Sequence, residues 1–299
     1  MNSSNQIIRT ESPSSDRKRW LPNPEHRLRS LVGRGVLWLG SGLLLSLLAA
    51  SWAGAAAAHQ NFTPESDLAG SWAFTPDPAL PDVLLIGDSI SIGYTRPVRA
   101  MLKGRANVFR IMSADGRQPG NGGDTRMGLE GIEPWLAGHH WRVIHFNWGM
   151  WDFCYRNPAS TEHGNRDKLH GMLPVSPDDY ALNLEKLIVR LKATGAELIW
   201  ASTTIVPDGE PGRFTGDEIK YNKIAAAVMA RHGIRTNDLY ALSAAMPAAK
   251  FRALADVHFT KEGYDDLARQ VRATIVSALT PANHVKRSDD SAGATAHPN

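Results

Sequence analysis

Short, mostly apolar runs recur along the chain from residue 82 onward, and longer segments with helical periodicity separate them. A short apolar run bounded by glycine or polar residues is typical of a buried strand. Five runs predict strands: Asp82–Gly87, Asn107–Met112, Arg142–Asn147, Glu197–Thr204 and Ile234–Thr236. Four segments predict helices: Pro97–Gly104, 177–194, Ile219–His232 and Lys261–Leu279. This alternation predicts a three-layer α/β/α domain around a five-stranded, mostly parallel sheet.

The ends of the expected helices carry capping signals. Ser176 precedes Pro177 and two acidic residues, which is the usual order at a helix N-terminus. Gly195 ends that helix, and Thr260 is the expected cap of the last one. Pro97 is expected in the first turn of its helix, where the missing N–H of proline does no harm.

The N-terminal region has a different composition from the rest of the chain. Residues 35–58 carry no charge and follow a basic stretch, which is the layout of a secretory signal. The same run is long enough to span a bilayer if it is not cleaved. We therefore expect residues 1–58 to be a signal peptide or anchor, and the remainder to be secreted or periplasmic. Residues 59–80 are expected to be a linker, 81–281 the folded domain, and 282–299 a disordered tail.

The formal net charge of +3 has a local origin. Seven of the 33 Lys and Arg residues, but only three of the 30 acids, lie in residues 1–34, so the rest is nearly neutral. This balance gives no support for a nucleic-acid surface on the folded part, so no nucleic-acid partner is expected, and membrane contact is expected only through an uncleaved leader. The single cysteine, Cys154, permits no internal disulfide and is expected to be a small buried hydrophobe.

The candidate chemistry lies where strands end, because sites in parallel sheets form at the carboxyl ends of the strands. Ser89, in "DVLLIGDSIS", directly follows the first predicted strand. A serine there is commonly only a cap or turn residue, and it becomes a nucleophile only with a base in hydrogen-bond reach. His258 immediately precedes the last predicted helix and can turn back toward Ser89, whereas His145 lies in an apolar strand and is expected to be a core residue. No metal or cofactor is expected, because no His or acidic pair has a convincing ligand spacing.

Four stretches carry a resemblance to a known family. They are "IGDSIS" (Ile86–Ser91), "GGDTRMGLEGI" (Gly122–Ile132), "NWGMWD" (Asn147–Asp152) and "DVHFTKEGY" (Asp256–Tyr264). In this order and spacing they resemble the conserved blocks of the SGNH, or GDSL-type, hydrolases. The resemblance implies a flavodoxin-like SGNH hydrolase domain at 81–281, with Ser89 as nucleophile and His258 as its general base. It also implies an oxyanion hole that includes the backbone amides of Ser89 and Gly123.

The third block departs from the family pattern. The family reads Gly-x-Asn-Asp, with Asn as a further oxyanion donor, whereas this chain reads Gly149–Asp152 as Gly-Met-Trp-Asp. Trp151 has one N–H donor and either replaces that Asn or lines the site, and we favour the lining role. Asn147 is a candidate oxyanion donor if the loop bends back. Trp148 and Trp151 are candidate substrate-binding residues that would stack against a sugar ring.

The last block departs as well. The family reads Asp-x-x-His, but the residue three positions before His258 is Ala255. Asp256 lies only two positions before it, so it serves as the third catalytic residue only if the loop is reshaped. Otherwise a backbone carbonyl orients His258 and the site is a dyad. Asp88 and Asp152 are expected to fix their loops by accepting hydrogen bonds.

These observations predict an exported serine esterase that hydrolyses O-acyl esters, with an O-acetylated carbohydrate as the expected substrate. One alternative is a non-catalytic carbohydrate- or envelope-binding protein on the same fold, which the two departures favour. Another is an acyltransferase, which would share the covalent intermediate. The polar insertion at residues 155–175 is expected to be either a lid on the substrate side or a disordered segment.

Overall fold

The computed structural model describes residues 71–280. The predicted leader at 1–58, the first part of the predicted linker and the predicted tail at 282–299 lie outside the described residues. Those assignments therefore stay predictions. Between residues 71 and 280, no helix is both long enough and apolar enough to cross a membrane.

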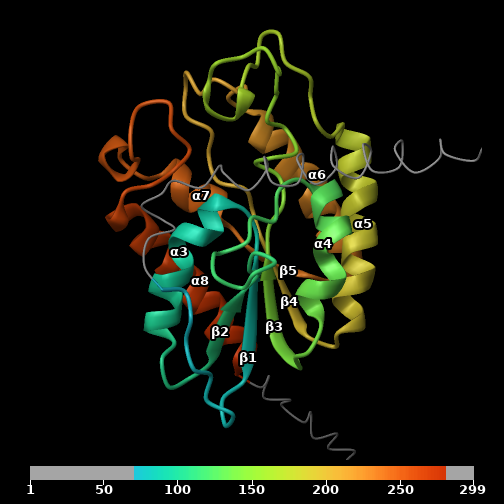
Figure 1. Cartoon of the computed structure of the whole chain (residues 1–299), viewed down its shortest axis with the longest axis vertical. Coiled ribbons are helices and arrows are strands. Elements are labelled where there is room, and N and C mark those ends of the chain that lie inside the picture. The colour runs from blue at the N-terminus through green and yellow to red at the C-terminus, as the bar shows by residue number, and fades with distance from the viewer. Residues whose placement is uncertain (1–70, 281–299) are drawn as a thin grey trace, which may run out of the picture. The chain divides into compact units, whose positions relative to one another are not determined.

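Five parallel strands form the central sheet in the order β2-β1-β3-β4-β5 (Figure 1). The strands are β1 (Asp82–Ile86), β2 (Asn107–Arg110), β3 (Trp141–Phe146), β4 (Glu197–Ala201) and β5 (Arg235–Asn237). The predicted α/β fold and strand number are confirmed, and the pairing is parallel throughout. The direction of winding reverses between β1 and β3, and ligands of open parallel sheets bind at such a reversal.

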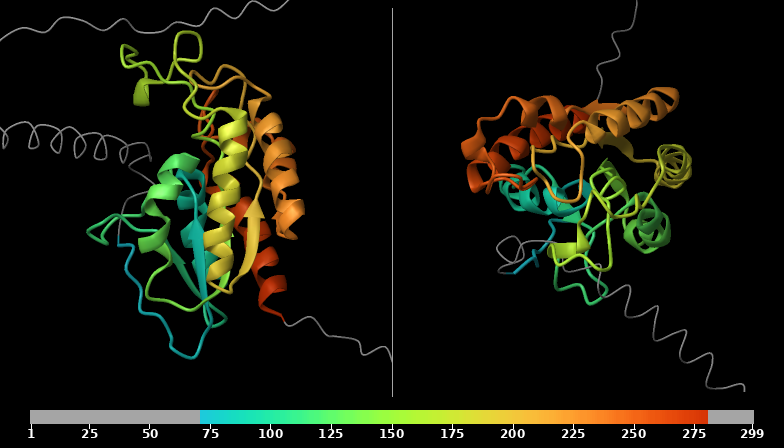
Figure 2. Two further views of the ribbon diagram at one scale, coloured as in Figure 1. Left: turned by 90° about the vertical axis from the view of Figure 1, so that its right-hand side faces the viewer. Right: turned by 90° about the horizontal axis from the view of Figure 1, so that it is seen from above.

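Helices cover both faces of the sheet (Figures 1 and 2). On one face lie α3 (Ser89–Met101), α7 (Leu239–Ala244) and α8 (Lys261–Leu279). On the other face lie α4 (Thr125–Leu136), α5 (Pro177–Ala193) and α6 (Asp217–His232). Two short 3-10 turns, η1 (His163–Asn165) and η2 (Ala248–Lys250), lie in the connecting loops. The predicted three-layer arrangement is therefore present.

Strand β1 lies in the middle of the core because both of its faces are covered. Val83, Leu85 and Ile86 have no exposed surface. This explains why the strand reads as a continuous apolar run and not as an alternating one. Burying each such side chain contributes roughly 1.5–3 kcal/mol to stability. The strand therefore provides a rigid base for the loop that follows it.

Helix α3 begins at Ser89 and not at Pro97, so the predicted start of this helix was wrong. Asp88 caps the helix by accepting a hydrogen bond from the N–H of Ile90. Ile90 and Val98 belong to one buried stripe that runs along the helix past the proline. Pro97 is thus an interior residue, and the burial of this stripe outweighs the hydrogen bond that proline cannot make.

Two helices were not predicted from the sequence. Gly128 and Pro134 interrupt the helical pattern of α4, and α7 has only six residues. Both helices have an aspartate cap, Asp124 for α4 and Asp238 for α7. Capping and tertiary packing therefore form these helices where hydrophobic periodicity is weak.

Part of the predicted linker packs on the domain. Residues 71–80 contain no helix or strand, yet Trp72 is buried and the guanidinium of Arg96 lies 4.1 Å from the centre of its ring. Asp77 donates its N–H to the side chain of Asn107 at 2.9 Å. The chain thus joins the folded domain before β1 begins.

The insertion at residues 155–175 is held by hydrogen bonds to a second long loop, residues 207–216. Tyr155 donates its N–H to the carbonyl of Gly212 at 2.7 Å, and Lys168 donates its N–H to that of Pro211 at 2.8 Å. The insertion is therefore a folded segment and not a disordered one. Its role as a lid stays a prediction.

Candidate active site

The loop after β1 places Ser89 at the carboxyl edge of the sheet. Asp88 Oδ1 accepts the N–H of Ile90 at 2.9 Å, which confirms the predicted loop-fixing role of Asp88. Burial raises the pKa of the Asp88 carboxyl, although this hydrogen bond opposes the rise. Ser89 is the first residue of α3, so its N–H has no acceptor within the helix and lies at the positive end of the helix dipole.

Ser89 and His258 meet at this edge although they are distant in the sequence. Ser89 Oγ lies 2.9 Å from His258 Nε2. His258 precedes α8, whose cap Thr260 accepts the N–H of Gly263, and α8 packs beside α3. The Ser89 residue is 6% exposed and the His258 side chain 14%, so the pair is shielded from bulk water but still accessible.

Asp256 extends this pair to a triad. Its Oδ1 lies 2.6 Å from His258 Nδ1 and also accepts the backbone N–H of His258 at 3.0 Å. The loop is reshaped because Ala255 adopts a left-handed backbone with φ of 60°. Of the two predicted arrangements, the structure has the triad and not the dyad.

The charge of Asp256 suits this position. Burial raises the pKa of its carboxyl, but the hydrogen bonds from His258 outweigh burial and leave that pKa below its ordinary value. The carboxylate therefore stays ionised near neutral pH. A charged acceptor at Nδ1 keeps the proton on that nitrogen, which leaves Nε2 free to accept the proton of Ser89.

Gly123 lies beside the nucleophile loop, since its neighbour Gly122 donates an N–H to the carbonyl of Gly87 at 3.0 Å. Gly123 has φ of 61°, a left-handed backbone that favours glycine, and a Cβ there would overlap the side chain of Met127. The N–H of Gly123 donates to Asn121 Oδ1 at 2.9 Å. Nothing in the sequence indicated this role for Asn121. Its side chain accepts the same N–H of Gly123 that an oxyanion would need, so this hydrogen bond must be shared or broken when an oxyanion forms.

Residues 85–265 match the model of the GDSL-like Lipase/Acylhydrolase family, a match that extends over more than half of the chain. The chain belongs to this family. A search of curated proteins finds no match.

Solved structures of low sequence identity share the fold of this GDSL-like hydrolase. The lipase/acylhydrolase from Enterococcus faecalis is 19% identical with a TM-score of 0.53, and the match covers 68% of this chain and 98% of that one. An acetyl xylan esterase is 14% identical with a TM-score of 0.50, over 65% and 99% of the two chains. An α/β hydrolase from the metagenome of Lake Arreo, Spain, is 17% identical with a TM-score of 0.50, over 67% and 97%.

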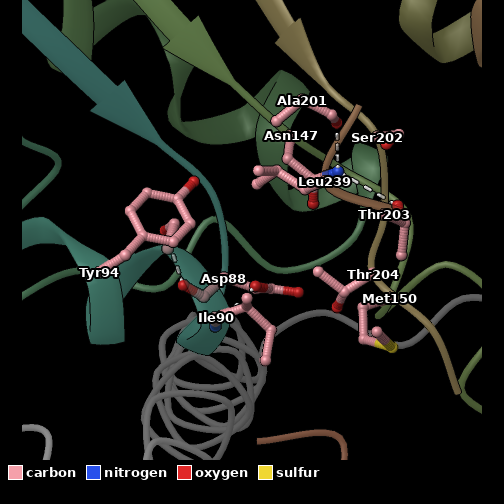
Figure 3. A pocket seen from close by; sticks show the side chains of 11 residues that line it. Asp88, Ile90, Tyr94, Asn147, Met150, Ala201, Ser202, Thr203, Thr204 and Leu239 are labelled. Atoms are coloured by element: carbon pink, nitrogen blue, oxygen red, sulfur yellow. Dashed lines mark hydrogen bonds between the residues drawn. The ribbon is translucent and has the colours of Figure 1, made fainter. Parts of the chain in front are cut away.

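The structure contradicts the predicted oxyanion role of Asn147. Its Nδ2 donates to the carbonyl of Ala201 at 2.8 Å and to Thr203 Oγ1 at 3.1 Å (Figure 3). Both amide hydrogens are therefore used to tie the end of β3 to the end of β4. In this GDSL-like hydrolase, Asn147 therefore does not take the place of the asparagine that is the further oxyanion donor in the family pattern.

The predicted stacking surface of Trp148 and Trp151 is also contradicted. Trp148 is 1% exposed and Trp151 is 4% exposed, so neither ring offers an open face to a sugar. Trp148 Nε1 instead donates to the carbonyl of Gly122 at 3.2 Å and supports the loop of Gly123. The guanidinium of Arg156 lies 4.7 Å from the centre of the Trp151 ring.

Asp152 fixes its loop, as predicted. Its Oδ1 accepts both the backbone N–H of Thr125 at 2.9 Å and the Thr125 hydroxyl at 2.6 Å, which ties the third block to the start of α4. Asp152 is fully buried, and this burial raises the pKa of its carboxyl to about 8. Its Oδ2 has no hydrogen-bond partner among the described residues.

A small cavity lies beside Asp88 and Ile90, the two neighbours of Ser89 (Figure 3). Asn147, Thr204 and Leu239 belong to its lining, and the buried Thr204 Oγ1 has no hydrogen-bond partner within residues 71–280. Its volume of about 10 Å³ is at the lower limit for one water molecule. The cavity is therefore too small to be the substrate pocket.

Sequence reasoning also missed a buried ion pair near the site. Arg213 Nη1 lies 2.8 Å from Glu210 Oε1, and Arg213 Nε donates to the carbonyl of Met150 at 2.7 Å. The positive charge of Arg213 also opposes the rise in the pKa of Asp88. A Glu and an Arg three positions apart in a polar loop give no sequence signal for such a contact. Within residues 71–280, no three His, Cys, Asp or Glu side chains are grouped as metal ligands.

Proposed function

We propose that this GDSL-like hydrolase is a serine esterase that cleaves O-acyl esters. The observation that carries this proposal is the hydrogen-bonded chain from Ser89 Oγ through His258 to Asp256, with distances of 2.9 Å and 2.6 Å. A hydroxyl becomes a nucleophile when a base is in reach and an acid orients that base. All three groups meet at the carboxyl edge of the sheet, where substrates of this fold class bind.

The reaction has two similar halves. Ser89 Oγ attacks the carbonyl carbon of the ester while its proton passes to His258 Nε2, and the carbonyl electrons move onto oxygen. The backbone amides of Ser89 and Gly123 stabilise this oxyanion. The intermediate then expels the alcohol, which takes the proton from His258, and leaves an acyl ester on Ser89. Water attacks that ester in the same way, which releases the carboxylic acid and restores the hydroxyl.

An O-acetylated carbohydrate is the substrate class we propose. One structure of the same fold is that of an acetyl xylan esterase. Because the tryptophans near Ser89 are buried, the sugar would be held by the loops 155–175 and 207–216 and not by Trp148 or Trp151. We also propose that the enzyme acts outside the cytoplasm, based on the uncharged run at 35–58.

The direct test is hydrolysis of para-nitrophenyl acetate by the wild type and by Ser89→Ala. We expect the substitution to lower kcat by about 10³-fold or more, because the nucleophile is lost. Ser113→Ala is a matched control, since its hydroxyl only bonds Asp115 and Gln118 in an exposed loop. Equal rates for the wild type and Ser89→Ala would contradict the esterase function and favour a binding protein.

The substrate is tested with acetylated polysaccharides. Purified enzyme is mixed with O-acetylated xylan and with the same polymer after chemical deacetylation, and free acetate is measured. We expect acetate to be released only from the acetylated polymer, and only by the wild type and not by Ser89→Ala. Transfer of the acetyl group to an added sugar without release of acetate would identify an acyltransferase instead.

A further inference from the structure

Arg110, the last residue of β2, is a buried cation in the centre of the site's supporting structure. It is only 4% exposed. Its guanidinium is a flat group with five N–H donors in fixed directions. Within residues 71–280, the hydrogen-bond acceptors of Arg110 are all neutral carbonyl or hydroxyl oxygens, and none is a carboxylate.

These acceptors lie in four different segments. In α3, Arg110 Nη1 donates to Thr95 Oγ1 at 3.0 Å and to Ser91 Oγ at 3.3 Å. Arg110 Nε donates to the carbonyl of Ile111 at 3.2 Å. Arg110 Nη2 donates to the carbonyl of Gly120 at 2.6 Å and reaches that of Gly87 at 3.4 Å.

The last two contacts join the two halves of the oxyanion hole. Gly87 precedes Asp88 and Ser89, and Gly120 begins the loop that reaches Gly123. Two backbone amides stabilise one oxygen only if both lie about 2.7–3.1 Å from it. The two loops are already joined by the hydrogen bond from the N–H of Gly122 to the carbonyl of Gly87 at 3.0 Å, and Arg110 Nη2 adds a second bridge between them.

Stability alone does not account for an arginine at this place. Burying a cation without a carboxylate partner is costly, and an apolar side chain of similar size often stabilises a core equally well or better. Burial lowers the pKa of the Arg110 guanidinium to about 9, and nearby Tyr94 and Asp88 oppose this. The side chain therefore remains a cation at neutral pH and keeps all its donors.

We propose that Arg110 is a positioning residue that holds the Gly87–Ser89 loop and the Gly120–Gly123 loop so that the amides of Ser89 and Gly123 face the same oxygen. The proposal rests on the esterase function proposed above. A purely structural arginine would affect stability but not the rate of each folded molecule. A positioning arginine affects kcat, because its loss weakens the hydrogen bonds that stabilise the oxyanion.

The test uses Arg110→Met, Arg110→Lys and the control Val108→Ala. Val108 lies on the same strand, is fully buried and carries no polar side chain, so its truncation reports loss of packing alone. Each variant is assayed below its melting temperature with an acetate ester and with the corresponding thionoacetate ester. A thiocarbonyl sulfur accepts hydrogen bonds weakly, so the ratio of the two rates reports how well the oxyanion hole works.

We expect Arg110→Met to lower kcat for the oxygen ester by about 10²-fold with little change in KM, because misplacing an oxyanion donor costs about 10²–10³ in rate. Arg110→Lys should lose about 10-fold, because an ammonium cannot replace the fork that spans both loops. In both variants the rate with the thionoester should fall much less, and Val108→Ala should leave the ratio unchanged.

Two outcomes would overturn the proposal. Equal fractional losses with both esters, or an unchanged kcat, in Arg110→Lys and Arg110→Met would show that the arginine only supports the fold. If Arg110→Met does not fold, the ratio of the oxygen-ester rate to the thionoester rate in Arg110→Lys is sufficient to test the proposal. If the wild type shows no hydrolysis that depends on Ser89, the esterase function itself is contradicted. If the wild type is active but the ratio of the two rates is the same in the Arg110 variants, only the proposed role of Arg110 is contradicted.

Discussion

At the scale of single residues, Ala255 determines how the imidazole is held. It stands where the family pattern has its acid, and its left-handed backbone turns the next residue back toward His258. One oxygen of Asp256 then accepts both the backbone N–H and the Nδ1–H of His258. A left-handed alanine costs roughly 1–2 kcal/mol, which these two charge-assisted hydrogen bonds can offset.

Replacing Asp256 tests this arrangement. Asp256→Asn keeps an acceptor oxygen but removes the negative charge that stabilises the imidazolium, so we expect kcat to fall by about 10²-fold or more. Steady-state kinetics beside Asp265→Asn, which removes an acid paired with Lys261 at the surface, gives the matched comparison. Turnover close to that of the wild type would mean that Asp256 does not orient His258.

The meeting of Ser89 and His258 could be predicted because each residue stands in a motif next to a predicted element boundary. The role of Asp256 stayed open because it depends on the backbone angle of Ala255, which a sequence pattern does not reveal. Asn147, Trp148 and Trp151 were assigned wrongly for a different reason. Their hydrogen bonds and burial depend on segments distant in sequence, such as Ala201 and Gly122.

Asp152 gives a pH-dependent prediction. The folded state raises its pKa from an ordinary value near 3.8 to about 8, so folding favours the protonated carboxyl. Its contribution to stability is complete below about pH 4 and is lost as the pH rises through 8. We expect the free energy of unfolding of the wild type, relative to Asp152→Asn, to fall from pH 5 to pH 9. Urea unfolding at several pH values measures this, and a constant difference would contradict the shifted pKa.

At the scale of elements, the distance between α3 and α8 controls the meeting of Ser89 and His258. Gly93 on α3 faces the ring of Tyr264 on α8, and a Cβ at Gly93 would overlap that ring. The missing side chain therefore lets the two helices approach closely. Since Ser89 begins α3 and His258 immediately precedes the cap of α8, their spacing follows from this contact.

Gly93→Ala is expected to push the helices apart. Overpacking of this kind costs about 1–3 kcal/mol, which thermal unfolding would measure. We also expect kcat to fall by roughly 10-fold, because small displacements of catalytic groups are costly. The double variant Gly93→Ala, Tyr264→Leu relieves the overlap and should recover part of the activity. A destabilised Gly93→Ala with normal kcat would show that this contact does not set the Ser89–His258 distance.

The elements differed in how well the sequence predicted them. All five strands were located, and β1 to β4 are short, mostly apolar runs. These four strands end before the predicted run does, whereas β5 ends one residue after it. The start of α3 was misplaced, because Pro97 is a strong N-terminal signal that tertiary packing overrides. Helix α4 was missed because its glycines serve close packing, as where Gly128 contacts the ring of Trp148.

At the scale of the whole domain, three loops adjoin one another at the catalytic edge. The insertion at 155–175 is bonded to the loop 207–216. That loop in turn approaches the triad, because a Cβ added at Gly209 would contact Ala255 at 3.4 Å. The arrangement of sheet and helices could be predicted from strand–helix alternation. The conformation of these loops could not, because it depends on backbone hydrogen bonds between polar segments that have no periodicity.

Covalent labelling tests whether Ser89 is a nucleophile that His258 activates. The protein is treated with an alkyl fluorophosphonate, digested, and the modified residue is mapped by mass spectrometry in the wild type, Ser89→Ala and His258→Ala. We expect a single adduct on Ser89 in the wild type, none in Ser89→Ala, and labelling slowed by at least about 10²-fold in His258→Ala. No adduct on Ser89, or equal labelling rates with and without His258, would contradict this expectation.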